Sequence, residues 1–294
     1  MSNNTEKSQI ANRRSQINNL PIGIFDSGVG GLTVYRALHN RLPNEHFVYL
    51  GDTARVPYGT KSLATVERYA IENSQFLASR GIKLLVVACN TASALALPKI
   101  RAQIGLDVVG VIGPGARKAV ELTKSNPRIA VIATEATVQS DAYPASIRQA
   151  SGAAEIIQTA CPLFVPLAEE NWTREPETFS IAKKYLSKIT EFAPEALVLG
   201  CTHYPILREV IQQTVGGRVK LIDSGEACAE EVEKLLNEKG LANPNKIEGE
   251  RRLCDDLDHF YVTDAAERFA RVAERFLGSP PAKLEAIEVF EIGK

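Results

Sequence analysis

Short apolar runs alternate with longer amphipathic segments along most of the chain. Continuous apolar runs are typical of parallel strands buried on both faces, whereas apolar residues three or four positions apart are typical of helices. The predicted strands are 21–25, 46–50, 83–88, 107–111, 128–133, 154–158, 196–199, 219–222 and 259–262. The predicted helices are 62–80, 138–150, 178–192, 204–215, 225–239 and 265–277. This alternation indicates the α/β class with mainly parallel sheets.

A weak internal repeat indicates two similar halves. The segments 84–95 (LLVVACNTASAL) and 195–207 (EALVLGCTHYPIL) each contain an apolar run, a cysteine, a threonine within two residues, and the start of a predicted helix. Ligands of open α/β folds bind at the carboxyl ends of the strands. If the two halves face each other, the loops at these strand ends would form one shared cleft.

Composition and charge narrow the possible partners. The chain has 294 residues, 45% of them hydrophobic, and a formal net charge of −1, so nothing global favours nucleic acid or an anionic membrane. No apolar run approaches the roughly 20 residues that span a bilayer. The first 20 residues are polar and lack the apolar segment of a signal peptide, so we expect a frayed extension and a cytoplasmic protein.

The five cysteines are candidates for chemistry or for packing. Their odd number and wide spacing argue against a disulfide framework, and the absence of C-x-x-C argues against structural zinc. Buried thiols commonly behave as small hydrophobic groups, which is the expectation for Cys228 and Cys254. Cys89 and Cys201 differ because each ends a predicted strand among small polar residues.

The segment VVACNTASA places Cys89 just before a helix predicted to begin at about Ala92. A helix N-terminus favours thiolate over thiol, which predicts a lowered pKa for this cysteine. Asn90 and Thr91 add hydrogen-bond donors for an anionic ligand. The alternative is that Cys89 is simply packed.

The segment LGCTHYP places Cys201, Thr202 and His203 together at a strand end, with Pro205 suited to begin the next helix. A single histidine is often a hydrogen-bonded structural residue. This one is two positions from a loop cysteine in a chain with only four histidines, which favours a functional role.

Two further loops follow predicted strands. In DSGVGG, Asp26 could cap a helix, and the G-x-G-G spacing differs from that of nucleotide-binding loops. In GDTARVPYG, the residues could form an ordinary surface turn, or the backbone amides of Tyr58 and Gly59 could bind a carboxylate.

Three chemistries fit these residues unequally. A Cys–His hydrolase would leave the second strand-end cysteine without a role. A metal site from Cys89, Cys201 and His203 would need a fourth ligand. Inversion of a stereocentre needs one group that removes a proton from one face and another that returns a proton to the opposite face. Two thiols facing each other across a cleft could do this without a cofactor or a metal.

Four segments together, FDSGVGGLTV, GDTARVPYG, VVACNTASA and LVLGCTHYP, resemble the signature segments of bacterial glutamate racemases of the aspartate/glutamate racemase family. The resemblance covers about residues 21–280. It implies that Cys89 and Cys201 act on opposite faces of the glutamate Cα, with Cys89 serving D-glutamate and Cys201 serving L-glutamate. It also implies that Asp26 assists the first cysteine near the substrate ammonium and that His203 assists the second.

The resemblance also implies a set of substrate-contacting positions in addition to Asp26 and His203. These are Ser27, Tyr58, Gly59, Asn90, Thr91 and Thr202, followed by Thr134, Thr137 and Glu169. The implied fold has two pseudo-symmetric α/β domains with the active site in the cleft between them. The implied division is a polar extension at 1–20, a first domain at 21–113 plus 224–294, and a second domain at 114–223.

The family further implies D-glutamate supply for peptidoglycan, a homodimer, and in some members regulation by a cell-wall precursor. Aspartate is the nearest rival substrate, although related aspartate racemases typically have Thr-Glu after the second cysteine where this chain has Thr-His. The residues also leave open a non-catalytic binder of amino acids or sugar-nucleotides, and a redox sensor that crosslinks Cys89 to Cys201.

Overall fold

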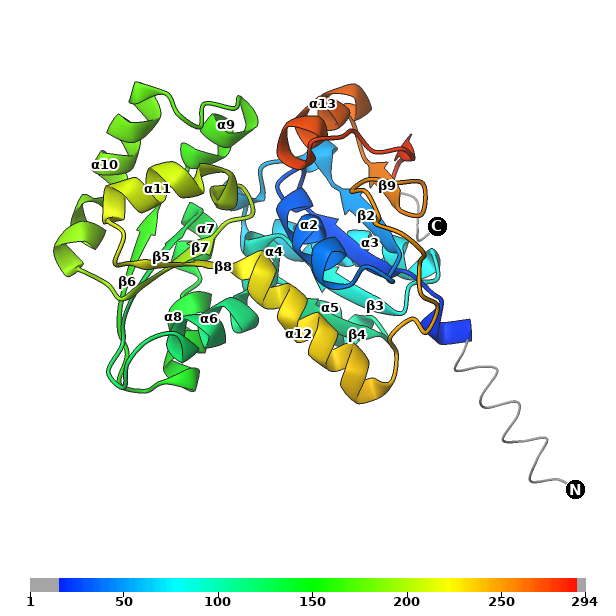
Figure 1. Cartoon of the computed structure of the whole chain (residues 1–294), viewed down its shortest axis with the longest axis horizontal. Helices are drawn as coiled ribbons and strands as arrows, with labels where there is room; N and C mark the ends of the chain where they lie inside the picture. The colour runs from blue at the N-terminus through cyan, green and yellow to red at the C-terminus, as the bar shows by residue number, and fades with distance from the viewer. Residues whose placement is uncertain (1–15, 290–294) are drawn as a thin grey trace, which may run out of the picture.

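The computed structural model describes residues 16–289, and its two sheets are built entirely from parallel pairings. The larger sheet has the strand order β10-β9-β2-β1-β3-β4, and the smaller has β6-β5-β7-β8. The strands are β1 (Ile22–Asp26), β2 (Phe47–Gly51), β3 (Leu84–Val87), β4 (Asp107–Gly110), β5 (Arg128–Ala133), β6 (Glu155–Ala160), β7 (Ala196–Gly200), β8 (Lys220–Asp223), β9 (His259–Val262) and β10 (Leu284–Ala286). These sheets, flanked by helices, confirm the predicted α/β class (Figure 1).

Helices connect the strands and cover both faces of each sheet (Figure 1). They are α2 (Leu32–Arg41), α3 (Leu63–Ser79), α4 (Asn90–Leu95), α5 (Leu97–Gln103), α6 (Ile112–Glu121), α7 (Glu135–Gln139), α8 (Ala142–Ala150), α9 (Phe164–Glu169), α10 (Pro176–Phe192), α11 (Arg208–Val215), α12 (Ser224–Lys239) and α13 (Ala266–Leu277). Short 3-10 turns lie at Thr53–Arg55, Tyr58–Thr60 and Tyr204–Leu207. None of the helices within residues 16–289 is long and apolar enough to cross a membrane.

The core of the larger sheet follows from the alternation of side chains along each strand. In β1, Ile22 and Ile24 pack with residues of α2, α12 and α13, whereas Phe25 packs on the opposite face with residues of α3, α4 and α5. Both faces are therefore apolar and covered, which is why the central strands read as continuous apolar runs. The polar residues of the site follow where these runs end.

The smaller sheet follows the same rule. Ile129 and Val131 of β5 face α6 and α8, and Ala130 and Ile132 face the layer of α9, α10 and α11. The edge strand β6 is only partly buried.

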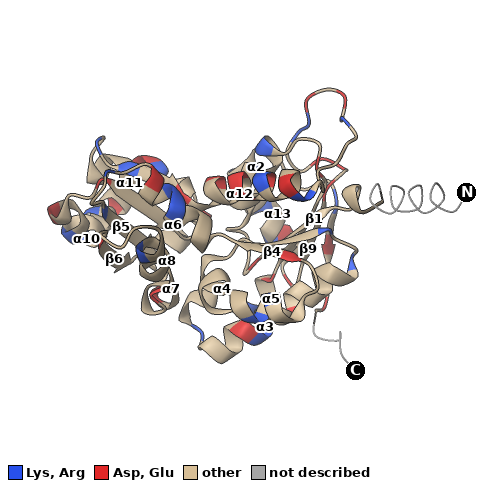
Figure 2. Cartoon of the chain, turned by 90° about the horizontal axis from the view of Figure 1, so that it is seen from below, with Lys and Arg blue, Asp and Glu red and all other residues tan. Residues whose placement is uncertain are grey.

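The helix α12 joins the two parts of the molecule. It leaves β8 of the smaller sheet and runs along α2, which covers the larger sheet (Figure 1). Acidic residues of α12 face basic residues of its neighbours (Figure 2): Arg41 of α2 pairs with Glu233, and Lys118 of α6 pairs with Glu230. The chain then returns through β9, α13 and β10 to complete the larger sheet.

The predicted domain division stays a prediction. Strands β1 to β4, β9 and β10 belong to the larger sheet, and β5 to β8 belong to the smaller one. The proposed boundary between 113 and 114 lies inside α6, whose Ile112 and Ala116 pack against the smaller sheet. Of the predicted N-terminal extension, residues 1–15 lie outside the described residues.

Several helices were missing from the sequence prediction, or had other bounds. The α6 segment IGPGARKAVE and the α9 segment FVPLAE contain prolines that read as turn signals, but each proline lies in the first helical turn, where it disrupts no helical hydrogen bond. The predicted helix at 138–150 is divided by Asp141, whose φ is 53°. The helix expected from about Ala92 begins at Asn90, so Cys89 is its N-cap.

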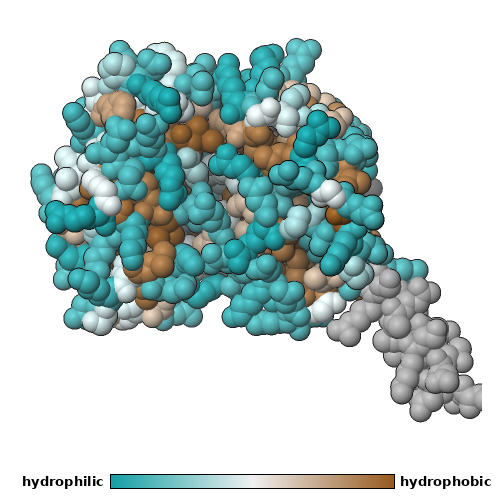
Figure 3. Space-filling model, in the orientation of Figure 1, coloured by the Kyte–Doolittle hydropathy of each residue, from teal (hydrophilic) through white to brown (hydrophobic). Residues whose placement is uncertain are grey.

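Large apolar side chains are exposed at a few separate positions among residues 16–289. Hydrophilic residues cover most of the face in Figure 3, and apolar groups form smaller patches between them. Within the described residues the most exposed large apolar side chains include Leu63, Trp172 and Leu163, which come from different elements. Single exposed apolar residues are normal on soluble proteins.

Candidate active site

Both strand-end cysteines open onto one cavity of about 270 Å³. Cys89 follows β3 of the larger sheet, and Cys201 follows β7 of the smaller one. The predicted residues that line this cavity are Ser27, Tyr58, Gly59, Cys89, Asn90, Thr91, Thr134, Glu169, Cys201, Thr202 and His203. The loops after strands of two different sheets therefore meet at one site.

Some lining residues were absent from the sequence prediction, and two predicted residues lie behind the cavity wall. The additional lining residues are Gly28, Val29, Val56, Pro57, Val165, Pro166 and Arg268. Asp26 and Thr137 are buried behind residues that line the cavity. The amphipathic pattern of the helix with Arg268 was visible in the sequence, but nothing in it indicated which polar residue reaches the site.

Cys89 is held by the first turn of α4 and by the loop after β1. The backbone N–H of Ala92 donates to its Sγ at 3.5 Å, and the thiol donates to Ser27 Oγ at 3.6 Å. Burial raises the pKa of Cys89 to about 12, with a further increase from the Asp26 carboxylate. The expected lowering of this pKa is therefore wrong, because burial and the nearby carboxylate outweigh the helix N-terminus.

Asp26 ends β1 and is almost fully buried. Its Oδ2 accepts from the backbone N–H of Gly28 at 2.9 Å, whereas Oδ1 has no hydrogen-bond partner within the described residues. Burial raises the pKa of Asp26, against the opposing effect of His203. The side chain does not cap α2, whose N-cap is Gly31. A buried carboxylate oxygen without a partner suits a cationic or hydrogen-donating ligand.

Cys201 has the opposite electrostatic surroundings. Its Sγ lies 3.9 Å from His203 Nδ1, and His203 Nε2 lies 3.1 Å from Glu169 Oε1. Burial alone would lower the pKa of His203, but hydrogen bonds to Cys201 and Glu169 outweigh it and raise the pKa to about 10. His203 is therefore an imidazolium near neutral pH, and it places a positive charge 3.9 Å from the Cys201 sulfur.

Three threonine hydroxyls form a closed cluster on one side of the cavity. Thr91 Oγ1 lies 3.0 Å from Thr134 Oγ1 and 3.2 Å from Thr137 Oγ1, and the last two are 3.0 Å apart. Because Thr91 follows β3 and Thr134 follows β5, the cluster joins loops of both sheets. Thr137 orients the hydroxyls of the two threonines that line the cavity.

Asn90 presents an amide group beside this cluster. Its Oδ1 accepts from the Tyr143 hydroxyl at 2.7 Å, which fixes the orientation of the side chain. Its buried Nδ2 has no partner within the described residues, so an N–H donor is left for an anionic ligand. Tyr143 lies far from Asn90 in sequence, and no local pattern could have indicated this support.

The loop with Tyr58 and Gly59 is fixed from behind. The phenol of Tyr58 donates to Asp52 and accepts from Asn73 Nδ2, so a network beneath the loop satisfies the hydroxyl. A Cβ at Gly59 would lie 2.9 Å from Thr134 Cβ. Glycine therefore permits the close approach of this loop to the β5 loop.

A second glycine permits the corresponding approach to the β7 loop. A Cβ at Gly30 would lie 2.3 Å from Thr202 Oγ1 and 2.5 Å from His203 Nδ1. The hydroxyl of Thr33 donates to the carbonyl of Thr202 at 2.8 Å. The first turn of α2 thus supports the loop with the second cysteine.

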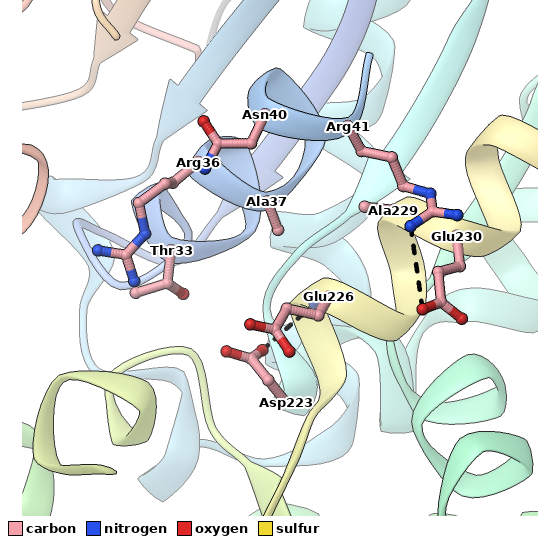
Figure 4. A pocket seen from close by; sticks show the side chains of 9 residues that line it. All are labelled: Thr33, Arg36, Ala37, Asn40, Arg41, Asp223, Glu226, Ala229 and Glu230. Carbon is pink, nitrogen blue, oxygen red and sulfur yellow. Dashed lines mark hydrogen bonds and ion pairs between the residues drawn. The ribbon is translucent and has the colours of Figure 1, made fainter. Parts of the chain in front are cut away.

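A larger cavity of about 430 Å³ lies between α2 and α12 (Figure 4). Its lining contains no cysteine or histidine. Its charged groups interact with their neighbours: Arg41 pairs with Glu230, and Asp223 accepts from the N–H groups that begin α12. The smaller cavity with the two thiols is therefore the candidate active site, because it has the acid–base groups and the unpartnered polar atoms.

Comparison with known proteins assigns the family. The model of the Asp/Glu/Hydantoin racemase family matches residues 22–232. The chain belongs to this family. It is 50% identical over 257 residues to a glutamate racemase of Geobacter metallireducens, covering 87% of this chain and 92% of the relative. It is accordingly a racemase, an enzyme of the isomerase class.

Solved structures share the fold. A glutamate racemase, RacE1, of Bacillus anthracis matches with a TM-score of 0.86 at 34% identity, covering 92% of this chain and 98% of the matched chain. A glutamate racemase of Francisella tularensis in complex with D-glutamate matches with a TM-score of 0.84 at 38% identity, covering 93% and 99%. The Escherichia coli enzyme in complex with L-glutamate and the activator UDP-MurNAc-ala matches with a TM-score of 0.72 at 29% identity, covering 91% and 98%.

Proposed function

We propose that this racemase interconverts L-glutamate and D-glutamate without a cofactor, with Cys89 and Cys201 as the two bases. The observation that carries the proposal is that the two thiols come from different sheets and line the same cavity. The identity to glutamate racemases over most of the chain supports glutamate as the substrate. A cavity of this size suits an amino acid better than a nucleotide.

The polar groups of the cavity would orient a zwitterion with two carboxylates. Asp26 would attract the ammonium group, which would compensate its buried charge. Asn90 Nδ2, the hydroxyls of Thr91 and Thr202, and the backbone of the Tyr58–Gly59 turn would donate to the carboxylates. Ser27 and Thr134 would complete the walls, and Thr137 and Glu169 would act through the side chains that they contact.

The unequal surroundings of the thiols define a direction for the first step. Cys201 lies 3.9 Å from a ring nitrogen of His203 and would be the base, and Cys89, with a pKa of about 12, is the group prepared to be a thiol. The Cys201 sulfur would take the Cα proton of L-glutamate, so an S–H bond forms and the electron pair stays on Cα. Cys89 would give its proton to the opposite face of Cα, forming D-glutamate and leaving Cys89 as the thiolate.

The carbanion must be stabilised between these two transfers. The fixed dipoles of the cavity, especially the oriented amide of Asn90 and the hydroxyl cluster, would act on the substrate carboxylate as negative charge spreads into it. The site is largely buried, which strengthens such interactions by excluding water.

The biological setting belongs to the same proposal. The enzyme would be a cytoplasmic homodimer. It would supply D-glutamate for peptidoglycan synthesis. The E. coli structure in complex with UDP-MurNAc-ala supports regulation of this chain by a cell-wall precursor as a further part of the proposal.

The direct test of the activity is circular dichroism of L-glutamate during incubation with the enzyme. We expect the optical signal to decay to zero with the wild-type protein, and the Cys89→Ser and Cys201→Ser variants to lose about a thousandfold or more of the rate. L-Aspartate is the control substrate, and circular dichroism of each variant controls for folding. Persistence of the L-glutamate signal, or activity on L-aspartate alone, would contradict the glutamate assignment.

A further inference from the structure

The helix α13 meets α9 at the edge of the candidate active site. In Figure 1 the two helices face each other across the upper part of the molecule, with α13 next to the larger sheet and α9 next to the smaller one. Arg268 Nη2 donates to Glu169 Oε2 at 3.1 Å, and Arg275 Nη1 donates to the Glu169 carbonyl at 2.8 Å. The two arginines are seven positions apart, about two helical turns, so both project from one face of α13 toward the same residue.

Glu169 connects α13 to the residues of the cavity. Its second carboxylate oxygen, Oε1, lies 3.1 Å from His203 Nε2, and His203 Nδ1 lies 3.9 Å from Cys201 Sγ. A single row of contacts thus runs from Arg268, whose side chain is 61% exposed, to a buried sulfur. Phe276 of α13 packs edge-on against the His203 ring and limits its rotation from another side.

We propose that Arg268 is a positioning residue that orients Glu169 across the cleft, and thereby holds His203 in the orientation that supports Cys201 as the base. The inference rests on the proposed function of Cys201. Glu169 carries two carboxylate oxygens with one partner each, so removal of Arg268 leaves the carboxylate free to rotate away from His203. Arg268 also lines the cavity, where it lies with residues that follow strands of both sheets.

The Arg268–Glu169 contact links the position of α13 relative to α9 to the support of Cys201. Arg268 belongs to the part built on the larger sheet, whereas Glu169, His203 and Cys201 belong to the part built on the smaller sheet. Any movement that separates α13 from α9 breaks the Arg268–Glu169 pair. Cys201 would therefore have its full support only while α13 stays in contact with α9.

A purely structural ion pair predicts a different outcome. An exposed arginine–carboxylate pair contributes little to stability. If Arg268 served only as surface charge, its removal would change neither the turnover nor the protonation of Cys201. If it positions Glu169, its removal changes both, and the effect disappears once residue 169 no longer carries the carboxylate that supports His203.

The test compares Arg268→Met, Arg268→Lys and Glu169→Gln with the double variant and with the wild type. We expect Arg268→Met to lower kcat for L-glutamate about tenfold to a hundredfold at an unchanged melting temperature, as small misplacements of catalytic groups do. Arg268→Lys should recover part of the loss. Adding Arg268→Met to Glu169→Gln should cause no further decrease in kcat, because Arg268 acts on His203 only through Glu169. Arg271→Met, at an exposed position about one turn from Arg268 on the same helix, is the matched control and should match the wild type.

A spectroscopic readout separates this inference from the proposed function. The ultraviolet absorbance of the Cys201 thiolate, taken as the difference from Cys201→Ser, should fall in Arg268→Met at neutral pH and stay unchanged in Arg271→Met. The positioning role would be overturned if Arg268→Met kept the kcat and the thiolate signal of the wild type. It would also be overturned if the loss of kcat from Arg268→Met added fully to the loss from Glu169→Gln. Failure of the wild type to racemise glutamate would instead overturn the proposed function.

Discussion

At the scale of single residues, the two cysteines have similar sequence contexts and dissimilar surroundings. Cys89 lies near the Asp26 carboxylate, and burial keeps its pKa high, at about 12. Cys201 lies beside His203, which two hydrogen bonds keep protonated. The sequence predicted both cysteines as a pair because each follows a strand. It could not predict their inequality, because the charge of His203 depends on Glu169 and the charge beside Cys89 comes from Asp26, and both carboxylates are far away in the chain from the cysteine that they affect.

The protonation of His203 predicts how stability depends on pH. Its pKa in the folded protein, about 10, is above the ordinary value of 6.5, so the imidazolium contributes stability that is complete below pH 6.5 and is lost as the pH rises toward 10. The difference in the free energy of unfolding between wild type and His203→Gln should therefore be larger at pH 6 than at pH 10. Urea unfolding at both values measures it. A difference that grows with pH would contradict the assigned charge.

At the scale of elements, most strands could be predicted, and several helices could not. Buried parallel strands are visible in the sequence as continuous apolar runs, and every predicted run overlaps a strand of the structure. The missed helices α6 and α9 begin with proline-containing turns, and the edge strand β10 is too short and too exposed to form an apolar run. The site residues could be predicted because their motifs lie in the loops that follow strands. Arg268 could not be predicted, because it reaches the site from a helix that covers the larger sheet.

The close approach of two of these loops gives a prediction at the same scale. Gly30→Ala would place a Cβ against Thr202 and His203, so the β7 loop must move and the rate should fall about a hundredfold. Gly152→Ala is the matched control, because a Cβ there meets nothing within 4 Å and the activity should stay unchanged. Steady-state kinetics on L-glutamate measures both. Full activity in Gly30→Ala would show that the loop tolerates displacement.

At the scale of the whole molecule, two sheets in different parts of the structure would supply one base each in the proposed mechanism. The carboxyl ends of β3 and β7 face the same cavity, so an amino acid between them would present opposite faces of Cα to the two sulfurs. The arrangement depends on α12, which joins the two parts, and on the α13 contact with Glu169 that lies across the cleft. Proton removal and proton return would therefore occur at different thiols, on different faces of Cα.

Racemisation of L-glutamate in D2O, stopped early in the reaction and analysed by mass for each enantiomer, shows whether two different thiols handle the proton. With two bases, the product receives its proton from a thiol already exchanged with solvent, whereas substrate that returns unreacted regains its own hydrogen. We expect deuterium at Cα in nearly all the D-glutamate formed and in almost none of the remaining L-glutamate. Equal deuterium content in the two enantiomers from the earliest times would contradict it.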